Sequence, residues 1–369
     1  MTHRVYLRPA GLVAADRSLG PSDYSGLLPL CGNGPFDFTA LEVIRRDGRQ
    51  VARRLVALGE VWESGTRSDY LEADEVLDRL TRPRRRLAGL DMTRTQIMGV
   101  VNVTPDSFSD GGRLADRAAA IDHGLRLIEE GATILDIGGE STRPGSDATP
   151  LAEELRRVLP VVEGLAAQTD VVLSIDTRKA AVMREAAGAG ARLINDVSAL
   201  SHDPAAADTA ADLGLPVILM HALGDPKTMQ DNPRYDDVLT DVYDYLDGRI
   251  AQAEAAGIPR SMLVVDPGIG FGKTLGHNLQ LMAGLALFHG LGTPVLLGAS
   301  RKRWIGTLTG EPIAANRVVG SVTAAVAGAA QGAQIVRVHD VKATRQALAV
   351  ATAALTGREP PLDGPKVAP

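Results

Sequence analysis

The strongest constraint on the fold is an alternation of short apolar runs with longer helical stretches, which begins near residue 95 and repeats eight times. The apolar runs are continuous and do not alternate with polar residues, which indicates strands covered on both faces of a parallel sheet. The runs span residues 96–103, 132–137, 171–175, 192–195, 216–220, 262–265, 294–297 and 335–338. The helical stretches span residues 116–130, 151–168, 178–187, 204–213, 236–256, 278–289, 314–331 and 342–355.

Eight strand–helix units within about 260 residues predict an α/β fold, a closed (β/α)8 TIM barrel. An open, doubly wound sheet is the alternative. It is less favoured because the units are evenly spaced and no Gly-x-Gly-x-x-Gly follows the first strand. In a barrel the chemistry lies in the loops after the C-terminal ends of the strands. We therefore expect functional residues directly after each apolar run.

Residues 1–90 do not share this rhythm and are predicted to form an N-terminal extension, small α+β or irregular, ahead of a catalytic barrel at 91–369. Asp47–Gly48, between two runs rich in Val, Ile and Leu, predicts a hairpin. Apolar spacing predicts a helix over residues 69–80. The segment carries no catalytic motif, and a scaffold packed on the barrel is its simplest interpretation.

The basic cluster at 82–86 could be a solvated linker or an anion-binding segment, and the linker is favoured. The whole chain has a net charge of −6, which argues against general nucleic-acid binding. We expect no membrane span and no signal peptide, because no apolar run is long enough for either. A single cysteine, Cys31, leaves no intrachain disulfide to form. A cytoplasmic enzyme or binding protein is expected.

Polar or charged side chains follow all eight apolar runs. One Asp at a strand end is commonly a helix N-cap, but capping does not account for a polar group at every end. Four cationic candidates lie there: Arg143, Lys302, Arg337 and His339. Arg337 and His339 alternate with Val338, so both should face the same side of the last strand. This set indicates a polyanionic ligand, most simply a phosphate or diphosphate.

A second set consists of oxygen ligands and hydrogen-bond acceptors. Asn102 and Asp110 could hold Mg²⁺ on a diphosphate, since hard cations take oxygen ligands. Buried carboxylates need donor partners, which a planar heterocycle with several N–H groups would supply while stacking on Arg337. The acceptors are Asp136, Asp176, Asn195 and Asp266. Together the two sets suggest a nitrogen heterocycle that bears a diphosphate leaving group.

The sequence lacks the elements of covalent catalysis. It has no nucleophile elbow and no Cys nucleophile, and His221 and His339 lack a third ligand for a catalytic zinc. Displacement of diphosphate by an incoming nucleophile is therefore favoured, with the protein supplying positioning and charge stabilisation.

Seven segments, in family order, resemble the dihydropteroate synthase family of pterin-binding (β/α)8 barrels. They are NVTPDSFSDGG (102–112), DIGGESTRPG (136–145), SIDT (174–177), INDV (194–197), DPGIGFGK (266–273), SRK (300–302) and RVHD (337–340). The resemblance covers residues 95–355. It implies a transferase of folate biosynthesis that joins 6-hydroxymethyl-7,8-dihydropterin diphosphate to 4-aminobenzoate, giving 7,8-dihydropteroate and diphosphate.

The resemblance also implies roles for individual residues. The pterin pocket is formed by Asp176, Asn195, Asp266 and Lys302, with Arg337 stacking on the ring. The diphosphate is contacted by Asn102, Arg143 and His339, and Mg²⁺ is held by Asn102 and Asp110. The 4-aminobenzoate pocket, which sulfonamides also occupy, is formed by Thr142, Pro144, Phe271 and Ser300. Catalysis is implied to be SN1-like through a cationic pterin and to depend on Asp176, Lys302, Arg337 and His339.

Two positions depart from the family pattern. Position 303 is Arg where many members have Ser near the aminobenzoate carboxylate, and position 269 is Ile where many have Phe. A corrinoid-dependent methyltransferase of the same pterin-binding family is the rival enzyme, but it would not need the diphosphate residues. A non-catalytic paralogue is the third alternative. The family further suggests a homodimer through barrel helices.

Overall fold

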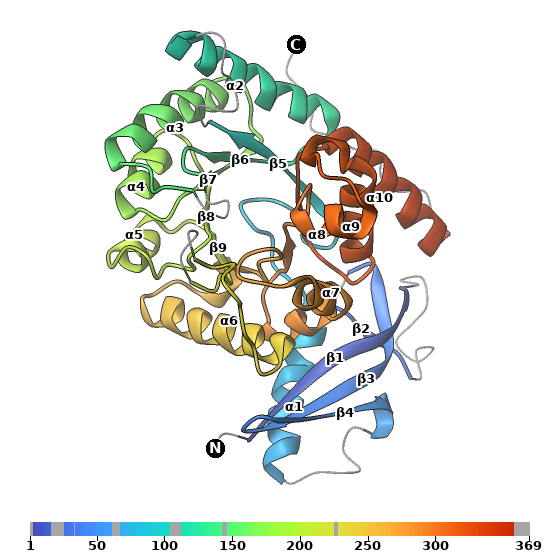
Figure 1. The fold of residues 1–369 in the computed structure, drawn as a ribbon. Coiled ribbons are helices and arrows are strands. Elements are labelled where there is room, and N and C mark those ends of the chain that lie inside the picture. The colour runs from blue at the N-terminus through green and yellow to red at the C-terminus, as the bar shows by residue number, and fades with distance from the viewer. Residues whose placement is uncertain are drawn as a thin grey trace.

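A computed structural model describes residues 3–15, 26–32, 34–60, 67–103, 112–141, 146–224 and 228–357. Figure 1 shows a ring of helices around a parallel sheet, with the N-terminal strands beside it. The strands are β5 (Gln96–Asn102), β6 (Ile134–Gly138), β7 (Val172–Asp176), β8 (Leu193–Asp196), β9 (Val217–Met220), β10 (Leu263–Asp266), β11 (Leu296–Leu297) and β12 (Ile335–Val338). In the described part of the chain, no helix is long and apolar enough to cross a membrane.

The predicted barrel is confirmed. The eight strands pair in parallel in the order β10-β9-β8-β7-β6-β5-β12-β11. A parallel bridge between Val265 and Val295 joins the two ends of this order, and the Val265 amide donates to the Pro294 carbonyl at 3.0 Å. The sheet therefore closes on itself, as a (β/α)8 barrel requires.

Helices alternate with the strands: α2 (Gly112–Glu130), α3 (Leu151–Ala166), α4 (Ala180–Gly188), α5 (Ala206–Leu213), α6 (Val238–Ala255), α7 (Leu275–Ala283), α9 (Val318–Ala329) and α10 (Val341–Thr356). One predicted helix, 278–289, is instead α7 followed by the 3-10 helix η5 (Leu285–Leu291). Helices α7 and η5 are separated by Gly284, where a Cβ would lie 2.5 Å from Leu239. Helix α8 (Arg303–Thr309) was not predicted.

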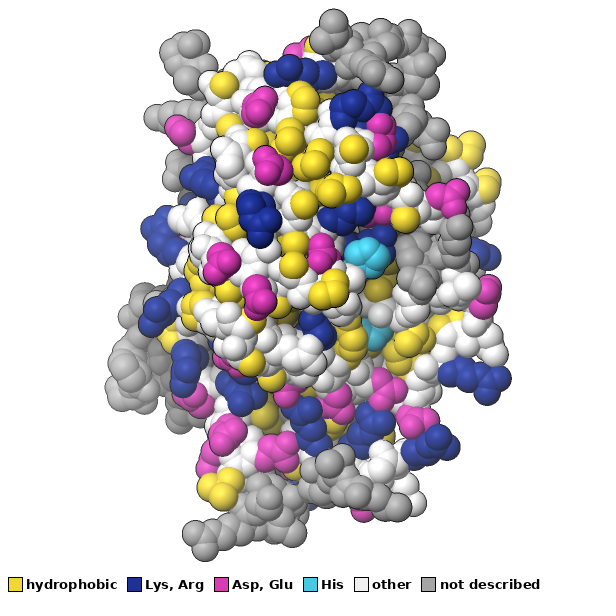
Figure 2. All heavy atoms as spheres, turned by 90° about the vertical axis from the view of Figure 1, so that its left-hand side faces the viewer, with side chains coloured by type: hydrophobic (Ala, Val, Ile, Leu, Met, Phe, Trp, Pro, Cys, Tyr) yellow, Lys and Arg dark blue, Asp and Glu magenta, His cyan; other side chains and the backbone are white. Residues whose placement is uncertain are grey.

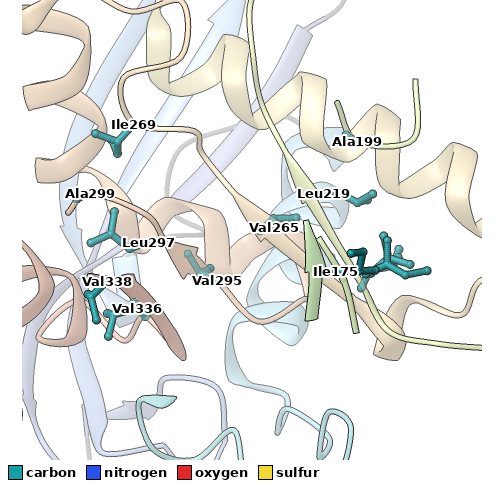
Figure 3. Packing of buried hydrophobic residues seen from close by; sticks show 14 of the residues in the cluster. Ile175, Ala199, Leu219, Val265, Ile269, Val295, Leu297, Ala299, Val336 and Val338 are labelled. Atoms are coloured by element: carbon teal, nitrogen blue, oxygen red, sulfur yellow. The ribbon is translucent and has the colours of Figure 1, made fainter. Parts of the chain in front are cut away.

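Alternation along the strands separates an outer core from the barrel interior. Figure 3 shows members of the outer core such as Ile175, Leu219 and Val338, which pack between strands and helices. The interior floor takes one residue from each strand: Met98, Ile134, Val172, Leu193, Ile218, Val264, Leu296 and Ile335. Leu87 and Met92 lie on either side of the predicted boundary at residue 90, and both pack against these eight side chains. The barrel is thus closed at its N-terminal end.

The N-terminal extension is an antiparallel sheet covered by one helix, here called the N-terminal module. It comprises β1 (His3–Ala14), β2 (Leu28–Pro29), β3 (Phe36–Asp47), β4 (Gln50–Ala57), the 3-10 helix η2 (Leu58–Glu60) and α1 (Arg67–Thr81). The hairpin and the helix were predicted, whereas β1 was not, because Pro9 and Gly11 interrupt its pattern. Among the described strands, β1 pairs with β3 alone and so lies at an edge, where proline is tolerated.

One face of the module packs on its own helix and the other on the barrel. Val5 and Leu7 belong to the module's core, whereas Tyr6, between them, belongs to the barrel's outer core. Tyr6 meets the ring of Tyr243 edge-on at a centroid distance of 5.3 Å. The solvated-linker interpretation of 82–86 is wrong for Arg84, which is buried and donates to the carbonyls of Thr293 at 3.2 Å and His289 at 2.8 Å.

Charges are mixed on the face of the molecule shown in Figure 2. Lys and Arg side chains are interspersed with Asp and Glu, and the described part of this face carries no extended patch of one sign.

Candidate active site

A polar layer lies directly above the apolar floor, because it takes the residue two positions further along each strand. Five of the eight positions are polar, namely Asp136, Ser174, Asn195, Asp266 and Arg337, and the other three are Val100, Met220 and Gly298. The alternation that buries the floor therefore also directs these polar groups into the barrel. Asp136 and Ser174 are fully buried and Asn195 and Asp266 nearly so.

Arg337 bridges the carboxylate of Asp136, in this layer, and that of Asp176, which lies two positions beyond Ser174 on β7. Its Nε donates to Asp136 Oδ2 at 2.6 Å, and its Nη2 donates to Asp176 Oδ2 at 2.9 Å. Asn195 Nδ2 donates to the same oxygen of Asp136 at 3.0 Å. The other oxygen, Asp136 Oδ1, is buried and has no hydrogen-bond partner among the described residues. Buried acceptors are normally satisfied, so this oxygen indicates a ligand with N–H donors.

Burial and neighbouring charges shift the pKa values of these groups. Burial, then the carboxylate of Asp136, raises the pKa of Asp176 to about 7 against the opposing effect of Arg337. Burial also raises the pKa of Asp266, although Lys302 opposes the shift. Burial lowers the pKa of Lys302 to about 8, although Asp266 opposes this shift. Perturbed groups that converge on the mouth of a barrel are characteristic of an active site.

The loop after β10 brings Asp266, Lys302 and Phe271 together. The amide of Gly268 donates to Asp266 Oδ1 at 2.7 Å. Gly268 has a φ of +69°, and a Cβ there would lie 1.9 Å from the His221 carbonyl, so only glycine fits. Lys302 Nζ donates to the Ile269 carbonyl at 2.5 Å and lies 4.5 Å from the centre of the Phe271 ring.

Ser300 and His339 form a second contact at the mouth. Ser300 Oγ lies 3.0 Å from His339 Nδ1 and accepts from the His339 backbone amide at 3.2 Å. The Ser300 hydroxyl can donate to Nδ1, which places the ring proton on Nε2. Arg301, between Ser300 and Lys302, has a φ of +56°. Its amide donates to Ser321 Oγ at 2.8 Å, which helps to hold this turn.

Several predicted site residues cannot be placed. Asp110, Thr142, Arg143 and Pro144 lie outside the described residues. Asn102 ends β5 on the interior-facing alternation of Met98 and Val100. No group of three His, Cys, Asp or Glu in the described ranges could hold a metal ion. Mg²⁺ commonly takes only one or two protein oxygens together with substrate phosphates, and the amide oxygen of Asn102 fits that requirement.

The two departures from the family pattern differ in their surroundings. Ile269 is fully buried in the outer core, so its exchange for Phe is a change of packing. Arg303 begins α8, and its side chain is exposed.

The sequence analysis did not predict a buried ionic network that lies beside the mouth of the barrel, between Glu140, Glu154, Arg178 and Lys179. Glu140 accepts from Arg178 Nη2 and Lys179 Nζ, both at 3.0 Å. Glu154 accepts from Thr177 Oγ1 at 2.6 Å and from Lys179 Nζ at 2.5 Å. Burial opposes ionisation of Glu140, but Lys179 and Arg178 outweigh it and lower its pKa. The network ties the loops after β6 and β7 together. Glu140 lies within a recognised motif, but nothing in the sequence links it to Glu154.

A second missed pair lies beside the loop after β10. Lys273 and His221 are buried, with Lys273 Nζ 2.8 Å from His221 Nδ1. Burial, then the charge of Lys273, lowers the pKa of His221, and burial lowers that of Lys273. Lys273 also donates to the Phe271 carbonyl at 3.0 Å, so it holds the segment that carries Phe271.

A family model described as "Pterin binding enzyme" matches residues 98–339. The barrel, with its polar layer above an apolar floor, is thus that of a pterin-binding enzyme. The dihydropteroate synthases of Escherichia coli K12 and Haemophilus influenzae are 50% and 48% identical to the chain over 270 and 261 residues. These alignments cover 73% and 71% of this chain and 95% and 94% of the relatives. The chain belongs to the dihydropteroate synthase family.

Solved structures of dihydropteroate synthases support the same family assignment. The Xanthomonas albilineans dihydropteroate synthase with 4-aminobenzoic acid superposes with a TM-score of 0.69 at 55% identity, over 72% of this chain and 96% of that chain. The same enzyme in complex with 7,8-dihydropteroate gives a TM-score of 0.66 at 52% identity, over 72% and 95%. The family match begins at residue 98, and the relatives are almost completely covered, so the N-terminal module is additional to what they share with this chain.

Proposed function

We propose that the chain catalyses the dihydropteroate synthase reaction, in which 6-hydroxymethyl-7,8-dihydropterin diphosphate and 4-aminobenzoate give 7,8-dihydropteroate and diphosphate. One observation supports this proposal most strongly. Arg337 bridges Asp136 and Asp176, and the buried Oδ1 of Asp136 has no hydrogen-bond donor among the described residues. A flat heterocycle with several N–H groups satisfies such a layer.

Different residues bind the pterin ring and the diphosphate of the first substrate. Asp176, Asn195 and Asp266 accept hydrogen bonds from the pterin, while Lys302 donates to it and the Arg337 guanidinium lies against the ring. The C–O bond between the pterin methylene and the diphosphate breaks, with both electrons leaving on oxygen. The carboxylates stabilise the resulting cation. The arylamine nitrogen then forms the new C–N bond and loses its proton.

The leaving group is held at the rim of the barrel. Asn102, Arg143 and His339 bind the diphosphate, and the Ser300 contact at Nδ1 places the ring proton of His339 on Nε2. Mg²⁺, held by Asn102 and Asp110, would neutralise charge on the diphosphate. The second substrate is taken by Thr142, Pro144, Phe271 and Ser300. We propose these assignments residue by residue from the family motifs.

The same proposal includes a cytoplasmic homodimer. Large apolar side chains are exposed on two neighbouring barrel helices: Val319 of α9 is 79% exposed and Val350 of α10 is 70% exposed. We place the subunit contact at these two helices, where exposed apolar side chains would be buried by a partner. A cytoplasmic location agrees with a chain whose single cysteine cannot form an intrachain disulfide.

The test is turnover by the purified full chain. The protein is incubated with the pterin diphosphate, 4-aminobenzoate and Mg²⁺, and dihydropteroate and released diphosphate are both measured. We expect the two products in equal amounts. A protein that binds the pterin but releases no diphosphate would instead support a non-catalytic paralogue. Methyl transfer from methyltetrahydrofolate to a corrinoid protein would support the methyltransferase alternative.

A further inference from the structure

We propose that the N-terminal module positions the aminobenzoate side of the active site by fixing the point where the chain enters α6. The inference rests on the proposed function, because it concerns the affinity for the second substrate. The module is extra to the part shared with the relatives, yet three of its arginines, Arg4, Arg46 and Arg53, bind the barrel helix that follows β9, and two of them do so where that helix begins.

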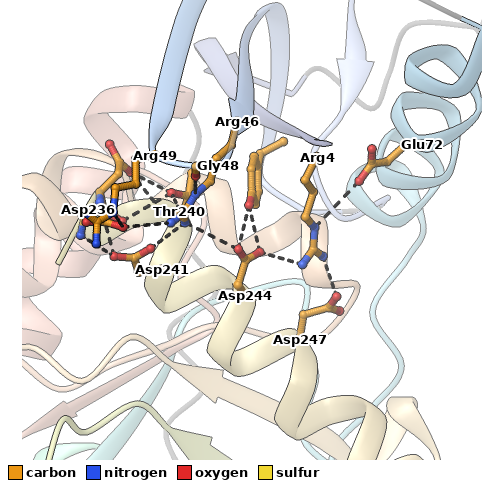
Figure 4. A network of polar contacts seen from close by, with 12 residues as sticks. Arg4, Arg46, Gly48, Arg49, Glu72, Asp236, Thr240, Asp241, Asp244 and Asp247 are labelled. Atoms are coloured by element: carbon orange, nitrogen blue, oxygen red, sulfur yellow. Dashed lines mark hydrogen bonds and ion pairs between the residues drawn. The ribbon is translucent and has the colours of Figure 1, made fainter. Parts of the chain in front are cut away.

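Arg46 and Arg53 bind the first turn of α6, as Figure 4 shows for Arg46. Arg53 Nη2 donates to Asp237 Oδ2 and Arg46 Nη1 to Asp241 Oδ1, both at 2.5 Å. Asp237 is the N-cap of the helix, and its side chain accepts from the Thr240 amide at 3.0 Å. Both arginine side chains are at most one-third exposed, so these pairs are only partly screened by water. They hold the N-terminus of α6 against the module.

The residues just before α6 hold the loop after β10. Tyr235 Oη donates to the Gly272 carbonyl at 2.8 Å, and Gln230 Nε2 donates to the Gly270 carbonyl at 2.7 Å. The Tyr235 ring also meets the His277 ring edge-on at 4.9 Å. The two carbonyls flank Phe271, so the loop that carries this ring is held from the chain that enters α6.

The loop in turn sets the surroundings of Lys302. Its Nζ is bound by the Ile269 carbonyl and lies against the Phe271 ring. A continuous series of contacts therefore runs from Arg46 and Arg53, through the entry to α6 and Tyr235, to the loop that carries Phe271. Loss of the two arginines removes their ion pairs to the entry of α6, from which Tyr235 reaches this loop. A small displacement of a ring that lines a binding pocket weakens binding without removing any catalytic group.

Arg4 provides a matched control. It also joins the module to α6, with Nη1 at 2.6 Å from Asp244 Oδ1 and Nη2 at 2.5 Å from Asp247 Oδ2 (Figure 4). These partners lie further along α6, beyond its first turn. Arg4→Ala therefore weakens the same interface while leaving the entry to the helix fixed.

The experiment compares the full-length wild type, Arg46→Ala/Arg53→Ala and Arg4→Ala in steady-state turnover and thermal unfolding. We expect both variants to lower Tm. Only the double variant should raise the KM for 4-aminobenzoate, on the order of 10-fold with kcat little changed, as displacement of a positioning element does. Arg46→Lys/Arg53→Lys, which keeps the charges, should recover part of the loss.

A double-mutant cycle tests the route. Tyr235→Phe should raise the same KM, and combining it with the arginine substitutions should add much less than the product of the separate effects. An unchanged KM in Arg46→Ala/Arg53→Ala, or fully multiplicative effects in the cycle, would overturn the inference while wild-type turnover still upholds the proposed function. An inactive wild type would instead defeat the proposed function, and the affinity for 4-aminobenzoate, measured by calorimetry in the same variants, would then test the positioning.

Discussion

Replacing Arg337 by Met should destabilise the protein in a way that depends on pH. Arg337 makes two charge-assisted hydrogen bonds, to Asp136 and Asp176. Asp136 is fully buried and Asp176 nearly so. Removing one partner of a buried ion pair costs about 3–5 kcal/mol, because the remaining charge is left without compensation. The variant can reduce this cost only by protonating a carboxyl group.

The pKa of Asp176 determines the pH range over which the stability changes. In the wild type, the pKa of Asp176 is about 7, above its ordinary value of 3.8. A carboxyl group whose pKa is raised by folding destabilises the folded state as pH rises, by about 1.4 kcal/mol per unit, until the pH passes the folded pKa. Wild type therefore loses stability up to about pH 7. In Arg337→Met the pKa of the Asp176 carboxyl group should be higher still, because its cationic partner is gone. The variant should therefore continue to lose stability above pH 7.

Urea unfolding of both proteins at pH 6 and pH 8 measures this difference. The free-energy gap between wild type and Arg337→Met should be larger at pH 8 by about 1.4 kcal/mol, one further pH unit of the same slope. Arg260→Met is the control, because Arg260 pairs with Glu254 at the surface, where water screens the pair and its contribution stays below about 1 kcal/mol. A gap for Arg337→Met that is equal at the two pH values would refute the reasoning.

Three further outcomes are expected. The pH profile of kcat/KM for the pterin diphosphate should be bell-shaped, rising as the group of pKa about 7 at Asp176 ionises and falling as Lys302, of pKa about 8, loses its proton; a flat profile from pH 6 to 9 would contradict this. Chelation of Mg²⁺ should abolish turnover but leave pterin binding measurable by calorimetry, since the metal serves the diphosphate; loss of both together would be unexpected. Val319→Glu, combined with Val350→Glu, should shift the protein from dimer to monomer in sedimentation velocity, whereas an unchanged sedimentation coefficient would place the subunit contact elsewhere.

The barrel could be predicted from the sequence because its strands are short, continuously apolar and evenly spaced. Local patterning was sufficient for the strands and most of the helices. It failed at Gly284, which separates α7 from η5 and lies too close to Leu239, distant in sequence, to carry a side chain, and at β1, whose proline is tolerated because the strand lies at an edge. Both failures are tertiary effects that a local pattern does not contain.

The inward-facing site residues could be predicted because polar groups are conspicuous at strand ends. Their partners could not, because contacts form between residues far apart in the chain. The sequence indicated that Arg337 is cationic and faces the interior, but not that Asp136 and Asp176 would share its guanidinium. In the same way Arg84 looked like one of several solvated arginines, and only the fold shows that it joins the module to the barrel.

The proposed function places a pterin in the polar layer of the barrel and a diphosphate at its rim. The most direct test is dihydropteroate formation by wild type, Asp176→Asn and His339→Ala, with pterin binding measured in parallel. We predict turnover in the wild type and a collapse in both variants. Asp176→Asn should also lose affinity for the pterin itself, whereas His339→Ala should lose affinity only for the diphosphate-bearing form. Activity that survives both substitutions would show that these two residues do not bind the pterin and the diphosphate as proposed.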